Sequence, residues 1–325
     1  MDKATYHELR DIKFMKLLLL GCTGFVGQEL IPTLLEAGHQ LTIVSRYESK
    51  NYVNQFDINK LEWIQIDPSQ LKSWDNTLLI EALKNNQGII NLVGEPITEQ
   101  RWTSSQLKII EDTRLNTTRG MINAMNKSKK IPKILVNASA IGFYGNSQTN
   151  TFKEEDKSGN DFLSKLCEKW EDIAYLKPRS TKLVIVRIGI VLGNGGGALG
   201  KMLPIFKAGL GGPIGDGMQW MSWIHRSDLC RIIKESLVSR KYSGVINAVA
   251  PNPVRMKEFS ATLGRSLGRP SIIPVPGGVL KLILGDGAKV VLEGQKVKSN
   301  ILDKIEYKFI YPTVQQAIEN IIKYS

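Results

Sequence analysis

Three glycines between a strand pattern and a helix pattern constrain the fold of this chain more than any other feature. Gly21, Gly24 and Gly27 follow the apolar run KLLLL at residues 16–20 and open the amphipathic stretch VGQELIPTLLEAG. In such a turn the first glycine permits the bend, the second lets the backbone approach a pyrophosphate, and the third lets helix and strand pack closely. The N–H groups at the helix N-terminus then attract phosphate. The segment therefore predicts a dinucleotide site rather than a turn without a ligand.

The alternation of apolar and amphipathic segments extends this prediction along the N-terminal part of the chain. Short apolar runs alternate with stretches in which apolar residues recur three or four positions apart, which is typical of a parallel sheet covered by helices. We expect strands at residues 16–20, 40–45, 61–66, 88–93, 133–138 and 182–188, and helices at 26–37, 104–125 and 162–175. The predicted fold class is α/β, a Rossmann-type doubly wound parallel sheet.

A glycine-rich segment interrupts this alternation after the sixth strand. Residues 189–217 hold too many glycines for a strand–helix unit, so we expect a looped excursion from the sheet. A helix near 223–237 and a strand near 244–249 are expected to return to the sheet, and two helical stretches follow Pro251.

The domain prediction follows from this change of pattern. We expect a nucleotide-binding domain of residues 15–188 plus 222–250, and a smaller C-terminal substrate lobe of residues 189–221 plus 251–325. Residues 1–14 mix acids and bases, fit neither a secretory signal nor a transit peptide, and are expected to form a disordered extension.

Composition argues against several classes of protein. The 325 residues include 43 Lys and Arg against 31 Asp and Glu, a formal net charge of +12. The basic residues are scattered and lack interleaved aromatics, so we expect a solvated surface and no nucleic-acid partner. No apolar run is long enough to cross a bilayer, and we expect a cytoplasmic protein without a membrane partner. Cys22, Cys167 and Cys230 lie far apart without the spacing of metal ligands, so we expect neither a disulfide framework nor a metal site.

The second predicted strand ends in the pair Ser45-Arg46, at the point where a dinucleotide fold selects its cofactor. An acidic residue there would bond the ribose 2′-hydroxyl, whereas an arginine accommodates a 2′-phosphate. The planar guanidinium with an adjacent hydroxyl favours NADP(H) over NAD(H). The competing interpretation is an exposed arginine at a strand end.

Longer motifs resemble those of one group of proteins. The GxxGxxG spacing is that of the extended short-chain dehydrogenase/reductase superfamily, and from about Met15 to its end the chain resembles the "epimerase family" group. The motifs that carry the resemblance are NLVGEPI at 91–97, RW at 101–102, SAIGFYG at 139–145, WE at 170–171, the glycine-rich run through MSWIH at 187–225, and LEGQKV at 292–297. The resemblance implies an extended Rossmann domain, a smaller substrate lobe and a characteristic C-terminal module.

The resemblance also implies which residues hold NADP(H). Residues of the first loop are expected at the pyrophosphate, and the pair after the second strand at the 2′-phosphate. Residues at the end of the fourth strand are expected along the adenosine ribose and the nicotinamide, and an arginine of the next helix is expected to reach the cofactor. In order, these residues are Gly21, Thr23, Gly24, Phe25, Val26 and Gly27; Ser45 and Arg46; Leu92, Val93 and Gly94; and Arg114.

The usual catalytic set of a short-chain dehydrogenase is absent from the sequence. That set is a Tyr, a Lys four residues later, and a Ser or Thr that polarises the same substrate oxygen. Alignment on Tyr144 leaves Ser139 one residue early, and the Tyr and Lys positions fall on Leu163 and Cys167. Ser139, Tyr144 and Cys167 are the candidate replacement acids, and for each a structural role is the competing interpretation.

Aromatic and charged residues near the expected cleft are candidates for substrate contacts. Glu95, Arg101 and Trp102 follow the fourth strand, where open α/β sheets place their ligands. Trp220, Trp223 and His225 lie where the chain returns from the glycine-rich segment. Indole faces with an arginine suit a planar or sugar-like anion, whereas packing between lobes and a hydrogen-bonded junction at His225 are the alternatives.

Two functions remain open from the sequence. The first is an NADP(H)-dependent oxidoreductase or epimerase, monomeric or homodimeric, that acts on a small molecule with sugar nucleotides among the candidates. The second is a regulatory or interaction protein that senses NADP(H) without hydride chemistry, for which the resemblance offers a cell-division label that the residues do not support.

Overall fold

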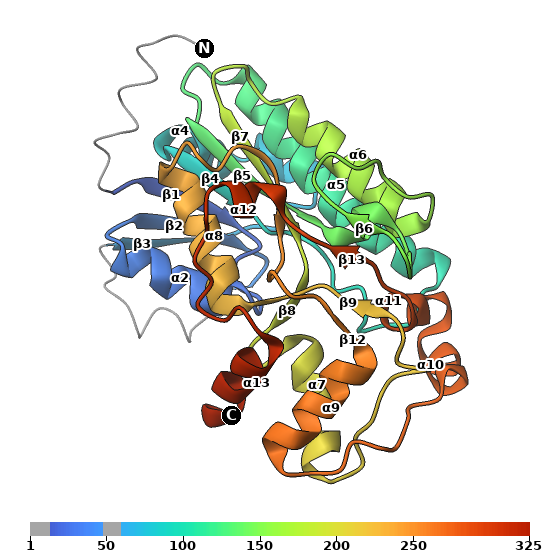
Figure 1. The fold of residues 1–325 in the computed structure, drawn as a ribbon. Coiled ribbons are helices and arrows are strands. Elements are labelled where there is room, and N and C mark those ends of the chain that lie inside the picture. The colour runs from blue at the N-terminus through green and yellow to red at the C-terminus, as the bar shows by residue number, and fades with distance from the viewer. Residues whose placement is uncertain (1–13, 48–59) are drawn as a thin grey trace.

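The computed structural model describes residues 14–47 and 60–325, so the expected extension lies outside the described residues except for Phe14. A seven-stranded sheet forms its centre, and every pair of neighbouring strands is parallel (Figure 1). From one edge to the other the strands are β3 (Leu61–Gln65), β2 (Gln40–Ser45), β1 (Lys16–Leu20), β4 (Gly88–Asn91), β5 (Ile134–Ala140), β7 (Lys182–Ile188) and β11 (Gly244–Ala248). The strand order reverses between β1 and β4, which confirms the Rossmann-type doubly wound fold.

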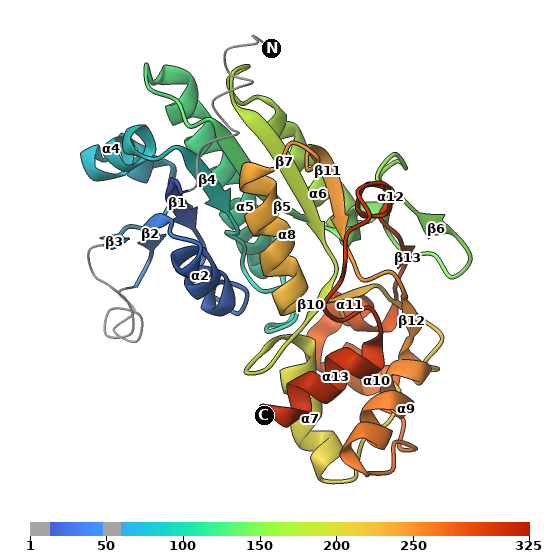
Figure 2. The ribbon, with the colours of Figure 1, turned by 60° about the vertical axis from the view of Figure 1, so that its left-hand side comes forward.

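Helices cover both faces of the sheet because its strands are apolar on both sides. In β1, Leu17 and Leu19 pack with α2 (Gly27–Glu36) and α8 (Arg226–Val238), while Leu18 and Leu20 pack with the opposite layer. That layer holds α4 (Thr77–Asn85), α5 (Ser104–Lys127) and α6 (Phe162–Tyr175), with the short 3-10 helix η2 (Leu71–Asp75) beside α5 (Figure 2). Such buried parallel strands read as continuous apolar runs, as KLLLL does.

The lobe lies beyond the carboxyl edge of the sheet (Figure 2). Its core gathers apolar side chains from three helices, including Leu203, Phe259 and Ile318. The helices are α7 (Gly197–Lys207), α9 (Met256–Leu267) and α13 (Val314–Lys323), and two small ladders join β8 (Ile190–Leu192) to β10 (Trp223–His225) and β9 (Trp220–Met221) to β12 (Val254–Arg255).

The glycine-rich segment is more ordered than the sequence predicts. Residues 189–217 were expected to be a looped excursion, but they contain β8 and the helix α7. Most of the glycines flank α7, which contains only Gly197 and Gly200, and Leu199, Leu203 and Phe206 line its buried face at helical spacing. The helix α4, which buries Leu79, Ala82 and Leu83, was not predicted either.

The C-terminal part of the chain packs partly in the lobe and partly on the nucleotide-binding domain. After the short elements α10 (Gly277–Leu284), η4 (Gly285–Ala288) and α11 (Lys289–Leu292), the strand β13 (Lys296–Val297) pairs with β6 (Thr151–Phe152). The helix α12 (Asn300–Lys304) then places Leu302 in the core beneath the sheet. Residues 296–309 thus pack on the nucleotide-binding domain rather than in the lobe to which residues 251–325 were assigned. No helix of the described residues is long and apolar enough to cross a membrane.

Candidate functional site

The loop between β1 and α2 uses its three glycines for different reasons. At Gly21 the φ angle is +71°, and an added Cβ would lie 2.6 Å from the backbone N and Cα of Val93. At Gly27 an added Cβ would lie 1.6 Å from the carbonyl oxygen of Cys22. At Gly24 an added Cβ would meet no atom of the described residues within 4 Å. The outer two glycines therefore serve the folding of the chain, whereas the middle one borders open space.

This open space lies at the start of α2, where a dinucleotide phosphate was predicted. Gly24 is exposed and precedes the first turn of α2, whose N-cap residue Val26 makes no side-chain capping hydrogen bond. A helix start with available backbone N–H groups and a nearby partial positive charge is suited to an anion.

The pair predicted at the 2′-phosphate lies at the end of β2, with Ser45 as its last residue and Arg46 directly after it, and the structure brings Glu95 to the same place. Arg46 Nη2 lies 4.0 Å from Glu95 Oε2, with 53% of the Arg46 side chain exposed and 18% of that of Glu95. The hydroxyl of Ser45 accepts the backbone N–H of Tyr47 at 3.2 Å. Glu95, predicted among the substrate residues, therefore lies beside the arginine predicted at the adenosine end of the cofactor.

The residues after β4 form a short backbone wall beside this loop. The N–H of Leu92 donates to the Leu20 carbonyl at 2.9 Å, and the N–H of Val93 donates to Asn91 Oδ1 at 3.2 Å. Both residues are half-buried, as is Thr23 in the glycine loop.

Arg114 of α5 supports this wall from one side. Its Nη1 donates to the Ile110 carbonyl at 2.9 Å, its Nη2 donates to the Glu95 carbonyl at 3.0 Å, and an added Cβ on Gly94 would lie 2.8 Å from its guanidinium carbon. Desolvation by burial lowers the pKa of Arg114. The side chain is therefore not an exposed helix arginine, and its direct contact with a cofactor stays a prediction.

Phe25 points from the glycine loop toward the lobe. An added Cβ on Gly196 would lie 2.7 Å from the Phe25 ring, and one on Gly197 would lie 2.9 Å from it. The carbonyl of Val26 accepts a weak hydrogen bond from the Cys230 thiol at 3.7 Å. The side chains of Phe25 and Val26 pack against other parts of the protein, so contact of either residue with a pyrophosphate would involve its backbone.

The two catalytic candidates belong to one buried polar network. Ser139 Oγ donates to Glu171 Oε1 at 2.6 Å. Arg187 Nε and Nη2 donate to the two oxygens of the same carboxylate at 2.9 and 2.8 Å. Arg187 Nη1 also donates to the hydroxyl of Tyr144 at 2.8 Å, and that hydroxyl donates to Asn247 Oδ1 at 2.7 Å. The protons of both candidate hydroxyls are thus already engaged within the protein.

Strand register explains how this network forms. Arg187 of β7 is the register partner of Ser139 in β5 and of Asn247 in β11, so three polar residues stand in one row near the carboxyl edge. Glu171, 3% exposed, reaches the row from α6. Neither Arg187 nor Glu171 was predicted as a site residue, although a charged residue inside the apolar run KLVIVRI was a usable signal.

Two of the candidate acids, Tyr144 and Cys167, are not prepared for proton transfer near neutral pH. Burial raises the pKa of Tyr144 to about 12 and that of the Cys167 thiol to about 11. At the Tyr position of the usual catalytic pair, Leu163 packs beside Gly142, where an added Cβ would lie 3.4 Å from the Cβ of Leu163.

Residues 14–47 and 60–325 hold no group of three or more His, Cys, Asp or Glu side chains that suits a metal ion.

Arg101 and Trp102 contact the C-terminal module. Arg101 Nη1 donates to the Leu282 carbonyl at 2.6 Å, and an added Cβ on Gly287 would lie 2.7 Å from the Trp102 ring. Trp102 Nε1 donates to the Ile97 carbonyl at 2.8 Å, and its ring meets Phe162 edge to face at 5.5 Å. These residues join the loop after β4 to α10 and η4.

The two other tryptophans differ in exposure. Trp223 is fully buried in the lobe core, where Nε1 donates to the Asn252 carbonyl at 3.0 Å, so the prediction that it contacts substrate is wrong. Trp220 is half-buried, with the Arg255 guanidinium 3.8 Å from its ring centroid and its Nε1 donating to the Gln148 carbonyl at 2.9 Å.

His225 forms a structural junction, which is the alternative that the sequence left open. Its Nδ1 accepts the N–H of Ser227 at 3.2 Å and so caps the start of α8. Its ring lies 4.0 Å from that of Tyr311, and burial lowers its pKa to about 4. A residue that is 4% exposed and already caps a helix is not placed as a general base for a substrate.

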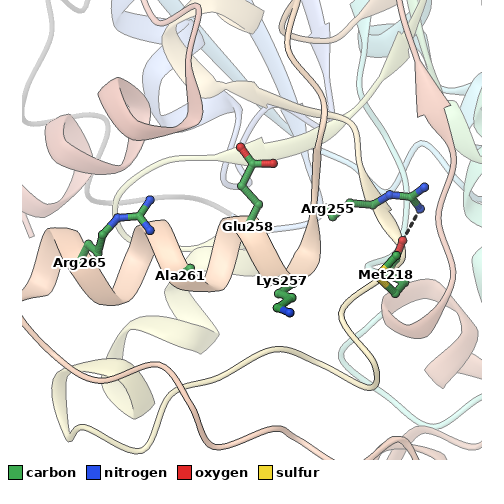
Figure 3. Close-up of a pocket in the computed structure, with 6 residues that line it drawn as sticks. All are labelled: Met218, Arg255, Lys257, Glu258, Ala261 and Arg265. Atoms are coloured by element: carbon green, nitrogen blue, oxygen red, sulfur yellow. Dashed lines mark hydrogen bonds between the residues drawn. The ribbon is translucent and has the colours of Figure 1, made fainter.

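A hollow of about 380 Å³ lies on the lobe rather than at the carboxyl edge of the sheet. Figure 3 shows Lys257, Glu258 and Arg265 along α9 and Arg255 turned toward the backbone of Met218, to which it donates a hydrogen bond. The hollow has charges of both signs and contains none of the predicted site residues.

Comparison with known protein families agrees with this arrangement. The model of the NAD dependent epimerase/dehydratase family matches residues 17–247, and that of a domain of unknown function, DUF1731, matches residues 275–321. Epimerase family protein SDR39U1 homolog, chloroplastic, of Arabidopsis thaliana is 38% identical over 311 residues, which cover 95% of this chain and 87% of the relative. Epimerase family protein SDR39U1 of Homo sapiens is 36% identical over 312 residues, which cover 95% of this chain and all of the relative.

Solved structures give the same result. The crystal structure of the human SDR39U1 protein with NADPH has a TM-score of 0.85 and 35% identity, covering 96% of this chain and 100% of that one. The nucleoside-diphosphate sugar epimerase from Corynebacterium glutamicum has a TM-score of 0.73 and 26% identity, covering 99% of this chain and 61% of that one. Because the family model spans more than half of the sequence and close relatives match over most of their length, the chain belongs to the NAD dependent epimerase/dehydratase family.

Proposed function

We propose that this chain binds NADP(H) and acts as an oxidoreductase or epimerase on a small molecule. The observation that most directly supports cofactor binding is the open space at Gly24. This residue lies between Gly21 and Gly27, the two glycines that the fold itself requires. Arg46 follows β2, the strand next to β1, and supports the phosphorylated cofactor, as does the NADPH in the structure of the human relative.

Each part of the cofactor has a candidate set of residues. The backbone of residues 21–27 would hold the pyrophosphate, and Ser45 and Arg46 would hold the 2′-phosphate. The backbone of Leu92 to Gly94 would border the ribose and the nicotinamide. When bound, the nicotinamide would supply hydride transfer, and the protein would supply orientation.

The substrate would lie at the carboxyl edge of the sheet, between the nucleotide-binding domain and the lobe. Trp102 is half-buried at that edge and offers an indole face beside Phe162. Sugar nucleotides are the first substrate class to test, since the Corynebacterium protein is a nucleoside-diphosphate sugar epimerase.

A specific observation favours a second function, which is NADP(H) sensing without hydride chemistry. Ser139 and Tyr144 donate their hydroxyl protons to Glu171 and Asn247, and no Tyr–Lys pair occupies the usual positions on α6. A protein whose catalytic positions hold no available proton donor would still bind the cofactor. Its binding to a partner would then depend on cofactor occupancy.

Titration with both cofactors tests the cofactor assignment. We expect NADPH to bind at least tenfold more tightly than NADH, because a charge-assisted hydrogen bond to phosphate contributes about 1.5–3 kcal/mol. Arg46→Gln should remove most of this preference and leave NADH affinity nearly unchanged. Arg119→Gln, at an exposed position of α5, is the matched control. Equal or tighter binding of NADH by the unaltered protein would refute the NADP(H) assignment.

A hydride-exchange screen then separates the two functions. The protein with labelled NADPH would be incubated with sugar nucleotides and small carbonyl compounds. Exchange or turnover with one of them supports the enzyme. NADPH binding without exchange, together with a partner whose affinity changes on NADPH addition, supports the sensor.

A further inference from the structure

We propose that Arg226 is a positioning residue for the glycine loop between β1 and α2, because it fixes Phe25 and α2 against residues Gly193–Gly197 of the lobe. We call these five residues the lobe loop. This inference rests on the proposed NADP(H) binding and adds a residue of α8, which packs beside α2, to the machinery that would hold the pyrophosphate.

The guanidinium of Arg226 joins α8 to two segments that are distant in sequence, residues 25–29 and the lobe loop. Its Nε donates to Glu29 Oε2 in the first turn of α2 at 2.7 Å. Its Nη1 donates to the carbonyls of Phe25 at 3.2 Å and Asn194 at 3.0 Å. Only 14% of the Arg226 side chain and 27% of that of Glu29 are exposed, so solvent weakens this ion pair less than it would an exposed one.

The Phe25 ring fills the space between these segments. The guanidinium carbon of Arg226 lies 4.6 Å from the ring centroid. The ring also meets Gly193, Gly196 and Gly197, where an added Cβ would come within 2.7–3.0 Å of it. The absence of a side chain at Gly193, Gly196 and Gly197 leaves room for the Phe25 ring, which explains why glycine stands at these three positions of the lobe loop.

Holding the Phe25 carbonyl has a direct consequence for anion binding. A trans peptide is planar, so the Phe25 carbonyl and the Val26 N–H point in opposite directions. Arg226 therefore sets the direction of an N–H group at the start of α2, beside the open space at Gly24. Without Arg226 this peptide can rotate, and the pyrophosphate site loses its fixed donor geometry.

Two ligands distinguish this role from general stabilisation of the fold. NADPH carries both a pyrophosphate and a 2′-phosphate, whereas adenosine 2′-monophosphate carries the 2′-phosphate alone. In Arg226→Met we expect NADPH affinity to fall at least tenfold, while the affinity for adenosine 2′-monophosphate stays within twofold of its value in the unaltered protein. Arg231→Met, on the same helix with its guanidinium carbon 4.9 Å from the Tyr307 ring centroid, is the control and should leave both affinities within twofold.

Two milder variants keep the test decisive should Arg226→Met fail to fold. Arg226→Lys keeps the charge but cannot bond Glu29 and both carbonyls together, and Glu29→Gln keeps the shape but removes the ion pair. Both should weaken NADPH binding by a smaller factor, with adenosine 2′-monophosphate unaffected. Unchanged NADPH affinity in all three variants, or an equal loss for both ligands, would overturn the inference. Failure of the unaltered protein to bind either ligand would instead overturn the proposed function.

Discussion

At the scale of single residues, the three glycines of the glycine loop differ in whether folding or a ligand requires them. Gly27 has no room for a Cβ beside the Cys22 carbonyl, and Gly21 combines a positive φ with close approach to Val93. Gly24 meets neither constraint, since its surroundings are open and exposed. A glycine that the chain does not need for its own packing is best explained by the close approach of another molecule.

This difference predicts opposite behaviour for two alanine variants. Gly27→Ala should lower the free energy of unfolding by more than about 2 kcal/mol, because the added methyl must displace backbone. Gly24→Ala should change the free energy of unfolding by less than about 0.5 kcal/mol but weaken NADPH binding at least tenfold. Chemical denaturation and NADPH titration measure the two effects.

Gly278→Ala, in α10 with equally open surroundings, is the matched control and should alter neither quantity strongly. Normal NADPH binding by Gly24→Ala would show that the open space at this glycine does not serve the pyrophosphate.

At the scale of elements, the start of α8 makes several contacts that hold neighbouring segments in place. His225 caps the helix through Nδ1, and Arg226, its first residue, binds the glycine loop. The buried His225 ring has its pKa lowered to about 4, so it is neutral in the folded protein near neutral pH. Protonation of His225 would remove its acceptor from the Ser227 N–H and place a charge in an apolar site.

A pH dependence of stability follows from this cap. The unfolded chain takes up the His225 proton near pH 6.5, and the folded chain takes it up only near pH 4, so the unfolded state binds more protons between these values. The free energy of unfolding should therefore fall as pH is lowered through this window, by up to about 1.4 kcal/mol for each pH unit.

Thermal denaturation between pH 7 and pH 5 measures this effect. His225→Asn keeps a side-chain oxygen for the cap and removes the titration, so its stability should change less over the same range. His39 is also buried with a lowered pKa and leaves part of the slope in the variant. Equal slopes for both proteins would exclude His225 as the source.

The elements that sequence analysis identified are those with local signals. β1, β2, β7 and α6 have the predicted boundaries, because an apolar run or a helical period is written in consecutive residues. The helix α7 was hidden because the glycines around it dominated the segment. The ends of β4 and β5 each differ by two residues from the prediction, as strand ends depend on the neighbouring strand.

The site was only partly accessible from the sequence for a related reason. The glycine loop and Arg46 are recognisable from their position after a strand. Arg187 stands out as a charge inside an apolar run, but its pairing with Glu171 depends on strand register and on how α6 packs against the sheet, which consecutive residues do not encode. Trp223 was misassigned because an apolar ring is equally suited to a substrate cleft and to a core, and only the three-dimensional packing decides between them.

At the scale of the whole molecule, the two parts are held together along the carboxyl edge of the sheet. Arg226 joins the glycine loop to the lobe loop, and Arg101 joins the loop after β4 to the C-terminal module. That module returns to the sheet, where Gln295 Nε2 donates to the Ile141 carbonyl at 2.8 Å. A cofactor bound at this edge would therefore contact a framework to which both parts contribute.

The structure of this chain in complex with NADPH tests the central claim most directly. We predict that the pyrophosphate lies over Gly24 against the start of α2, and that the 2′-phosphate lies about 2.7–2.9 Å from the guanidinium of Arg46. A 2′-phosphate directed away from Arg46, or a pyrophosphate bound outside residues 21–27, would contradict the account.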